Sequence, residues 1–374
     1  MRATFSVEEE AFRGEVIEFL SDYGELGGFF HQDREDLWPA VHDFFRAMGQ
    51  RGWLSLTWPT EVGGLGRPIA YEYILWDEVA YVRAARNSLA GVVARSIVRY
   101  ASDTQRQRWL PGIQSGELHF SLGYSEPEAG SDLASVRCRA ERRGDVYIVN
   151  GQKCWQSHAQ QSDYLWLLCR TGPPNSRSKG LSLLIVDLRA PGVTVRPLPT
   201  LDDHRLNEIH LDNVEVPVDQ RVGPENGAWA MMGEALADER HIQFPPKRVK
   251  RDLEDVVRWA RAAHLDESPA VRRRLAELAA RVQEVEIHGL SVLDAMQKGR
   301  PAALQAAANK VAHTEACQEI ARAAMDFGGP EALVEEDTVD ELWRSSLWET
   351  IGGGTSEIML SVVARQGLGL GARS

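Results

Sequence analysis

The sequence predicts an α+β protein with an N-terminal helical domain, a central antiparallel β-sheet or barrel, and a C-terminal helical bundle. Apolar residues recur at helical spacing in the first and last thirds, whereas the middle holds short segments rich in β-branched and aromatic residues. No stretch as long as a crossover helix separates these short segments, which favours antiparallel over parallel pairing. The chain has 374 residues, enough for two or three domains. We place the boundaries at residues 1–119, 120–223 and 224–374.

The helices of the first part are predicted from capping and periodicity. Ser6 and Glu9 have the spacing of a capping box ahead of an apolar-periodic segment. A loop rich in glycine and proline at residues 57–68 interrupts the helical pattern. The further helical segments cover residues 37–53, 71–101 and 103–117.

The middle and last parts differ in their periodicity. The predicted strands, each bounded by Gly, Pro, Asn or Asp, cover residues 145–151, 163–171, 181–188, 193–198 and 208–217. A long amphipathic helix is predicted at residues 271–299, and its apolar side carries Val271, Leu275, Leu278, Val282 and Val285. A second long helix is predicted to end at Gly328-Gly329, a C-cap followed by the breaker Pro330.

The composition excludes several classes of protein. A net charge of -12, from 42 basic and 54 acidic residues, argues against a nucleic-acid binder. No run of about 18 apolar residues is present to span a membrane, and the acidic N-terminus lacks the apolar core of a signal peptide. We therefore expect a cytoplasmic protein that binds neither nucleic acid nor membrane.

The cysteines and histidines predict no metal site. The cysteines form no CxxC pair, and the ten histidines are scattered without metal-ligand spacing. Buried, reduced thiols are the simplest interpretation. The cysteines are Cys138, Cys154, Cys169 and Cys317.

One turn carries an unusual number of hydroxyl groups. It contains Pro127 and Gly130, and the serines that crowd it are Ser121, Ser125, Ser131 and Ser135. Such a turn offers hydroxyls and backbone N–H groups that can bind the polar edge of a cofactor. A serine-capped turn between helix and sheet is the structural alternative.

A second candidate lies at the end of a predicted strand, in the segment GQKCWQS. Trp155 and Ser157 share a face if this segment is extended. A tryptophan and a hydroxyl on one face could cover a flat ring and bond its heteroatoms. A buried core tryptophan is the alternative.

Together, these segments resemble signatures of the acyl-CoA dehydrogenase family. YSEPEAGSD, GQKCW and GGGTSEI occur in the family's order, and the likeness covers essentially the whole chain. The resemblance implies that family's fold, FAD as the cofactor and α,β-dehydrogenation of an acyl-CoA or acyl-carrier-protein thioester. It also implies an electron-transfer flavoprotein as electron acceptor.

The family's roles can be carried over to single residues of this sequence. Ser125 would bond the pyrimidine edge of the flavin, Trp155 would lie against the isoalloxazine, and Ser157 would bond near N5. Ser131 would face the pantetheine or the cofactor. Further cofactor contacts implied by the resemblance are Leu122, Tyr124, Gly130, Arg261, Thr355 and Glu357.

The catalytic base is the main departure from the family pattern. Many members carry glutamate where this chain has Gly353, whose backbone N–H could still donate to a thioester carbonyl. A minority places the glutamate on a helix after the sheet, just before an arginine, and Glu239 and Arg240 match that pair. Glu349 and Glu357 are weaker substitutes.

The helical pattern agrees with Glu239 as the base. The stripe Trp229, Met232, Leu236 and Glu239 places a carboxylate on an apolar face, where desolvation raises its pKa. The alternative is a solvated charge cluster at a helix end. Pro245 and Pro246 end or kink this helix, so Glu239 could point elsewhere.

Further departures suggest an oligomer. The Phe-Gly of a family segment that reaches a neighbouring subunit is missing after Arg261. With GGGTSEI, this resembles a bacterial subgroup, including enzymes of steroid side chains, that works as α₂β₂ assemblies. We expect a homo-oligomer or an α₂β₂ hetero-oligomer. A catalytically impaired or non-catalytic subunit, and an oxygen-using flavin enzyme on the same fold, stay open as alternatives.

Overall fold

The computed structural model describes residues 4–24, 26–32, 34–86, 88–333 and 338–371. Within these ranges, the side chains of residues 29, 30, 88, 234–241, 331, 333 and 338 lie outside the description. The chain forms two compact units. The helical unit comprises Met1–Glu25, Ile69–Ala84 and Arg240–Ser374, and the sheet unit comprises Leu26–Pro68 and Ala85–Glu239. The division at residues 119 and 223 stays a prediction.

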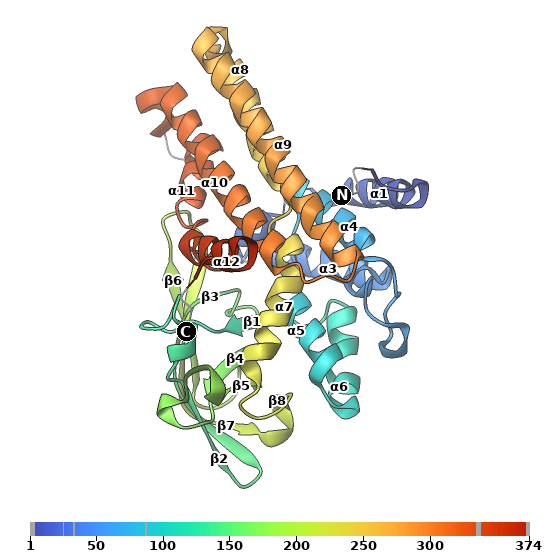
Figure 1. Cartoon of the computed structure of the whole chain (residues 1–374), viewed down its shortest axis with the longest axis vertical. Helices are drawn as coiled ribbons and strands as arrows, with labels where there is room; N and C mark the ends of the chain where they lie inside the picture. The colour runs from blue at the N-terminus through green and yellow to red at the C-terminus, as the bar shows by residue number, and fades with distance from the viewer. Residues whose placement is uncertain (1–3, 25, 33, 87, 334–337, 372–374) are drawn as a thin grey trace. The chain divides into compact units, whose positions relative to one another are not determined.

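The helical unit is built from long helices packed side by side, with α9 and α10 adjacent over much of their length (Figure 1). Its helices are α1 (Val7–Leu20), α4 (Ile69–Tyr81), α8 (Pro246–Ala262), α9 (Pro269–Gln297), α10 (Ala303–Gly328), α11 (Thr338–Ser346) and α12 (Ser356–Leu368). Leu278, Val282 and Val285 of the predicted α9 stripe are buried in its core. The Ser6–Glu9 capping box is present, and α10 ends at Gly328 with Gly329 as its C-cap, as predicted.

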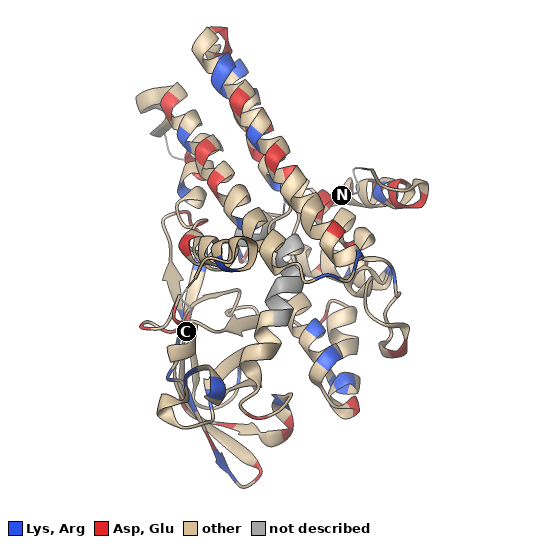
Figure 2. Cartoon of the chain, in the orientation of Figure 1, with Lys and Arg blue, Asp and Glu red and all other residues tan. Residues whose placement is uncertain are grey.

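Basic and acidic residues are interspersed along the ribbons of α9 and α10 (Figure 2). On α9, Arg274 pairs with Glu277 and Arg281 pairs with Glu284, each three residues further on. Such pairs suit a solvent-facing helix surface and leave the opposite face apolar. Helix α9 therefore has a charged face towards solvent and an apolar face that packs against the core of its unit.

The sheet unit contains helices α2 (Gly28–His31), α3 (Trp38–Gln50), α5 (Ser88–Tyr100) and α6 (Asp103–Gln114) beside its strands. The strands are β1 (Phe120–Gly123), β2 (Arg139–Arg143), β3 (Val146–Ser157), β4 (Tyr164–Arg170), β5 (Leu181–Asp187), β6 (Val193–Pro199), β7 (Arg205–Pro217) and β8 (Arg221–Val222). Their order is β6-β7-β3-β2-β4-β5-β8, with β1 on β4. Helix α7 (Ala228–Gln243) follows, and the α+β class is confirmed.

The pairing is antiparallel except at β4. β1 runs parallel to β4, and β2 pairs with β4 in parallel through Arg139 and Arg170 alone. The predicted antiparallel sheet is therefore confirmed for most strand pairs, and the parallel pairs made by β4 are the exception. The excursion through β2 and β3 separates β1 from β4, and it is long enough to serve as the crossover that parallel strands need.

Strand β4 is buried on both faces. Trp166 and Leu168 belong to the core beneath α5 and α6, whereas Leu165 and Leu167 belong to the core of the opposite face. Because side chains alternate between faces, a strand covered on both sides reads as a continuous apolar run. None of the described helices has the length and apolar character needed to span a membrane. The cysteines are buried and free.

Candidate functional site

Strand β3 is distorted where it presents Trp155. The β3–β7 register shifts between Cys154 and Gln156, and Trp155 has a φ of 74°. A bulge of this kind leaves one residue outside the ladder and redirects its side chain. Trp155 is 56% exposed, whereas Cys154 and Gln156 are buried. The alternative of a core tryptophan is therefore excluded, and Trp155 offers an aromatic face to a ligand.

Ser125 and Ser157 both belong to segments that meet at this bulge. The backbone N–H of Cys154 donates to the Ser125 carbonyl at 3.0 Å, which joins the serine-rich turn to the bulge. The Ser121 hydroxyl donates to the Ser157 carbonyl at 2.8 Å. Within the described part of the chain, the hydroxyls of Ser125 and Ser157 form no hydrogen bond of their own. Both hydroxyls can therefore bind a ligand.

A buried ion pair fastens the turn to β3. Lys153 has no exposed surface, and its ammonium donates to the Tyr124 carbonyl and to Glu126 Oε1, each at 2.9 Å. The Glu126 carboxylate also accepts the N–H groups of Arg137 and Cys138 at 2.7 and 2.8 Å. A buried charge is tolerated only when it is paired and hydrogen-bonded, and this pair meets both conditions. It therefore fixes both ends of the turn.

Sequence reasoning missed Lys153 and Glu126. The signal in the sequence was a lysine within a predicted strand segment, between Gln152 and Cys154. A lysine that such a strand buries requires an acidic partner, which could have been sought in the neighbouring turn. Arg170 was also missed. It is 4% exposed and donates to the carbonyls of Ala134 and Val136 at 2.9 and 3.0 Å.

The rest of the turn is open to solvent. Gly130 and Ser131 are exposed, while Leu122 and Tyr124 are half-buried and pack against the core beneath α5 and α6. Asp132 is held by Arg177 at 2.5 Å. Hydrogen bonds therefore join the start of the turn, at Tyr124 and Ser125, to the part of β3 that carries Trp155 and Ser157.

The glycine segment lies in the helical unit. Gly353 and Gly354 have φ values of +65° and +92°, a left-handed conformation that side chains disfavour. A Cβ at Gly353 would lie 3.1 Å from both Gln243 Nε2 and Phe244 Cζ. The backbone at Gly353 therefore suits glycine and disfavours the carboxylate that many family members carry.

Neither nearby glutamate is a good substitute for the base. Glu349 is 2% exposed and pairs with Arg248 at 2.5 Å. Burial alone would lower the pKa of Arg248, but the attraction of Glu349 outweighs it and raises that pKa. Glu357 is exposed, and backbone and Thr355 hydrogen bonds lower its pKa, which weakens it as a base. The Thr355 hydroxyl caps α12 by accepting the Ile358 N–H at 3.3 Å.

Arg261 stands apart from the glycine segment. It lies in the last turn of α8, its side chain is 70% exposed, and it is 3.9 Å from Asp266. Its position on the surface leaves it free to approach another subunit.

The side chains of Leu236, Glu239 and Arg240 lie outside the described residues, although all three belong to α7. Of the predicted stripe, Met232 is buried, but Trp229 is 44% exposed. The stripe as a whole stays a prediction, because the side chains of its second half lie outside the described residues. Helix α7 ends at Gln243, as the prolines predicted.

Comparison with known proteins identifies the family. Residues 6–117, 121–214 and 227–368 match the N-terminal, middle and C-terminal domains of acyl-CoA dehydrogenases. FadE26 of Mycobacterium tuberculosis, an acyl-CoA dehydrogenase, is 36% identical over 344 residues, which is 86% of each chain. The chain belongs to the acyl-CoA dehydrogenase family. It is an oxidoreductase that acts on the CH–CH bond of an acyl-CoA, and the family generally depends on FAD.

Other relatives extend the likeness to the full length. FadE29 of the same organism is 34% identical over 96% of each chain. Among solved structures, the Tcur3481-Tcur3483 steroid ACAD has a TM-score of 0.90 at 31% identity, and it covers 100% of both chains. The ChsE4-ChsE5 complex from Mycobacterium tuberculosis has a TM-score of 0.89 at 33% identity, again over 100% of both chains.

Proposed function

We propose that this acyl-CoA dehydrogenase binds FAD at the exposed Trp155 and the adjoining serine-rich turn. We further propose that Glu239 removes the α-proton of an acyl thioester. The single observation that supports flavin binding most is the exposed Trp155 on a bulge beside two unengaged serine hydroxyls. An aromatic face beside hydroxyls fits a flat ring with polar edges. When bound, FAD supplies the oxidant that accepts the β-hydride.

Around the ring, Ser125 bonds the pyrimidine edge and Ser157 bonds near N5. Leu122, Tyr124 and Gly130 supply contacts from the turn, and Ser131 faces the pantetheine or the cofactor. The buried Lys153–Glu126 pair keeps these groups in place before any ligand arrives. Thr355, Glu357 and Arg261 contact the cofactor of this subunit or of a neighbour.

The base is Glu239, with Arg240 in support. Of the three acidic candidates, Glu349 is engaged by Arg248 and Glu357 is exposed with a lowered pKa, which favours Glu239 by exclusion. The Gly353 N–H donates to the thioester carbonyl and stabilises negative charge as the α-proton leaves. The backbone at Gly353 can approach a ligand closely because it carries no side chain.

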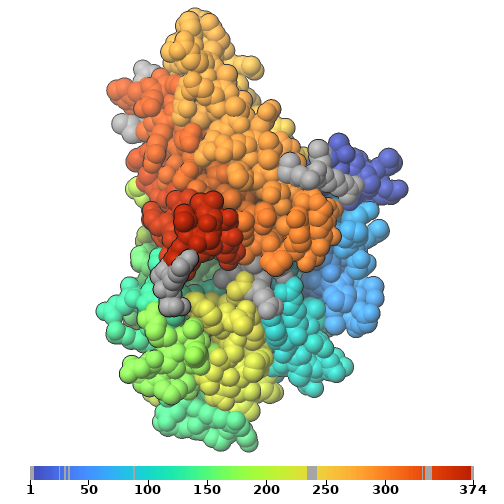
Figure 3. Space-filling model, viewed as in Figure 1, coloured from blue at the N-terminus to red at the C-terminus, as the bar shows by residue number. Residues whose placement is uncertain are grey.

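The acyl group is steroid-derived and the acceptor is an electron-transfer flavoprotein. Full-length likeness to a steroid ACAD supports the substrate class. The ChsE4-ChsE5 complex, which joins two differently named chains, supports a hetero-oligomer, for which we propose the α₂β₂ form, over a homo-oligomer. The C-terminal part of the helical unit carries exposed apolar side chains that suit contact with a partner subunit. Figure 3 shows α12, in red, on the surface of the molecule. These side chains are Leu347, Ile351, Leu360 and Leu368.

The test is anaerobic reduction of the purified yellow protein by a panel of thioesters that includes steroid side-chain and straight-chain acyl-CoA. We expect the flavin absorption band to bleach with the steroid-derived thioester. Glu239→Gln should keep the flavin and lose bleaching, whereas the matched control Glu234→Gln on the same helix should bleach normally. A Glu239→Gln protein that bleaches at the normal rate would refute the base. A chain that holds no flavin, alone or with a co-expressed partner, would favour a non-catalytic subunit.

A further inference from the structure

The glycine segment that carries Gly353 connects α11 to α12 through a series of tight turns. The Ile351 N–H donates to the Trp348 carbonyl at 2.8 Å. The Ser356 N–H donates to the Thr350 carbonyl at 2.9 Å. Within the part of the chain that the structure describes, the Gly353 N–H makes no hydrogen bond, and this residue is exposed. Gly353 therefore offers a donor to a ligand, and the direction of that donor depends on what holds the turns.

Two helices of the same unit hold the segment just before Gly353. Glu349, four residues earlier, is 2% exposed and pairs with Arg248 of α8 at 2.5 Å. Gln318 of α10 donates through Nε2 to Thr350 Oγ1 at 3.4 Å. The position of Gly353 is thus tied to α8 by an ion pair and to α10 by a hydrogen bond.

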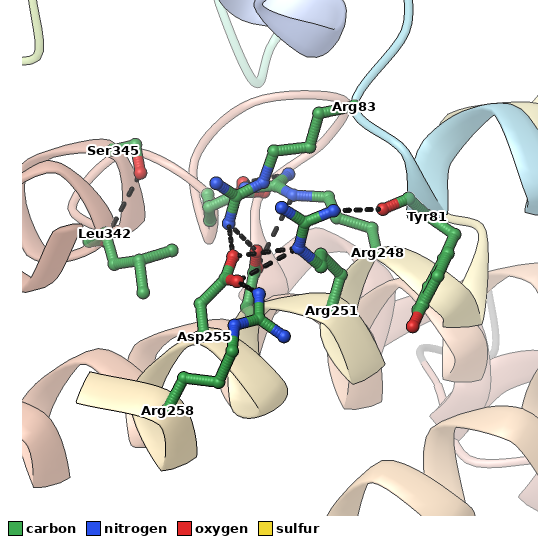
Figure 4. A network of polar contacts seen from close by, with 10 residues as sticks. Tyr81, Arg83, Arg248, Arg251, Asp255, Arg258, Leu342 and Ser345 are labelled. Atoms are coloured by element: carbon green, nitrogen blue, oxygen red, sulfur yellow. Dashed lines mark hydrogen bonds and ion pairs between the residues drawn. The ribbon is translucent and has the colours of Figure 1, made fainter. Parts of the chain in front are cut away.

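A series of paired charges fixes Arg248 in turn. Its Nε lies 3.7 Å from Asp252 Oδ2, one turn further along α8, and Asp252 also holds Arg83 at 3.0 Å. Arg83 pairs with Asp255 at 2.7 Å, and Asp255 holds Arg251 at 3.0 Å (Figure 4). Arg248, Asp252 and Arg83 each have two charged partners, so none of them can turn without losing an ion pair. The guanidinium that meets Glu349 therefore has a set direction.

Helix α8 is itself fixed at its start. Pro245 is its N-cap residue and Pro246 its first residue, so neither offers an N–H group or a capping side chain. Asp77 of α4 caps the helix instead, because its Oδ1 accepts the Lys247 N–H at 2.9 Å. Burial raises the pKa of Asp77 to about 7, and either form of the carboxyl has an oxygen that accepts this bond. Arg248, the next residue, therefore extends from a capped helix end.

The residue that follows α7 supports Gly353 as well. A Cβ at Gly353 would lie 3.1 Å from Phe244 Cζ, so this backbone rests close to the Phe244 ring. Phe244 is 5% exposed, and its carbonyl accepts a hydrogen bond from Asn309 Nδ2 at 3.2 Å. Its ring packs edge-on against His313, with ring centroids 5.5 Å apart. Gly353 therefore lies against a side chain that α10 keeps in place.

Stability alone does not account for the buried pair of Arg248 and Glu349. Removing two charges from water costs about as much as their attraction returns, so an apolar pair of similar size is often equally stable. What a guanidinium and a carboxylate add is a defined geometry of contact. We propose that Arg248 and Glu349 are positioning residues that hold Gly353 where its N–H meets the thioester carbonyl. The inference rests on the role proposed above for Gly353.

The experiment uses the holoenzyme and the acyl-CoA of the panel above that bleaches its flavin fastest. It compares Arg248→Met/Glu349→Leu, in which the buried pair becomes apolar, with Arg274→Met/Glu277→Leu, in which an exposed pair of α9 is changed in the same way. The rate of anaerobic flavin reduction and the Kd of the thioester are measured for each. The infrared carbonyl stretch of the bound thioester is recorded on dithionite-reduced enzyme, which cannot oxidise the ligand.

A hydrogen bond from Gly353 polarises the carbonyl, so the wild type and the α9 control should lower its stretching frequency below that of the free thioester. The buried-pair variant should lose most of this shift. It should reduce its flavin about tenfold more slowly, with a Kd changed by less than about threefold. Its melting temperature should stay within about 3 °C of the wild type, because the apolar pair leaves no charge uncompensated and Asp252 keeps Arg83.

A wild-type rate and carbonyl shift in the buried-pair variant would overturn the positioning role alone. If that variant does not fold, Arg248→Lys decides, because lysine keeps the charge without the rigid fork of the guanidinium. Normal rate and shift in Arg248→Lys would then overturn the inference. A wild-type protein that leaves the carbonyl stretch of the bound thioester unchanged would overturn the donor role of Gly353 and the inference with it. A flavin that no thioester of the panel bleaches would overturn the proposed function itself.

Discussion

Replacing Lys153 with methionine removes one partner of a buried ion pair while keeping much of the side-chain volume. Lys153 is fully buried and donates two hydrogen bonds, and Glu126 is left with the two backbone N–H groups of Arg137 and Cys138. Removing one member of a buried pair typically costs about 3–5 kcal/mol, because the other charge stays buried. The two remaining donors reduce that penalty, so we expect about 3 kcal/mol.

The assay is urea unfolding of the sheet unit, followed by tryptophan fluorescence, for both single variants and the double variant. Glu126→Gln should cost about as much as Lys153→Met, because it removes the negative charge that compensates the buried ammonium and replaces one of the two carboxylate oxygens by a donor amide. The double variant should cost clearly less than the sum of the two, with a coupling of about 2 kcal/mol. Additive effects, or a loss below about 1 kcal/mol for Lys153→Met, would refute the interpretation that this pair fastens the turn.

The same structure gives three further expectations. Trp155→Ala should weaken FAD binding about tenfold, measured by flavin fluorescence, while unfolding changes by less than about 0.5 kcal/mol because the indole is exposed. Burial, His42 and His158 lower the pKa of His119 to about 3, so unfolding should become easier as the pH falls from about 6.5 towards 3, and His119→Asn should flatten that dependence. Asp77 works in the opposite direction: its raised pKa means that stability falls as the pH rises from about 4 to 7, and Asp77→Asn should remove this loss.

Much of the helical architecture could be predicted from local signals. The Ser6–Glu9 capping box, the buried side of α9 and the Gly329 end of α10 each depend on residues within a few positions of one another. The parallel pairing of β1 with β4 could not be predicted, because a single strand pattern does not specify which distant strand it meets.

The candidate site shows the same limit. Trp155 was predicted as a cofactor contact from its motif. Its exposure depends on a β-bulge between Cys154 and Gln156, and no residue of this segment predicts a bulge. The Lys153–Glu126 pair joins residues 27 positions apart, and the Asp77–Lys247 cap joins residues 170 apart. Such partners become visible only when the fold brings them together. The roles of Glu239 and Arg240 stay predictions.

We propose that Glu239 is the base of this dehydrogenase, because Gly353 has no side chain that could remove a proton. The most direct measurement is the rate at which an anaerobic steroid side-chain acyl-CoA bleaches the flavin of the wild-type and Glu239→Gln proteins. We predict rapid bleaching in the wild type and no bleaching in the variant, with the flavin still bound in both. Equal rates in the two proteins would contradict the account.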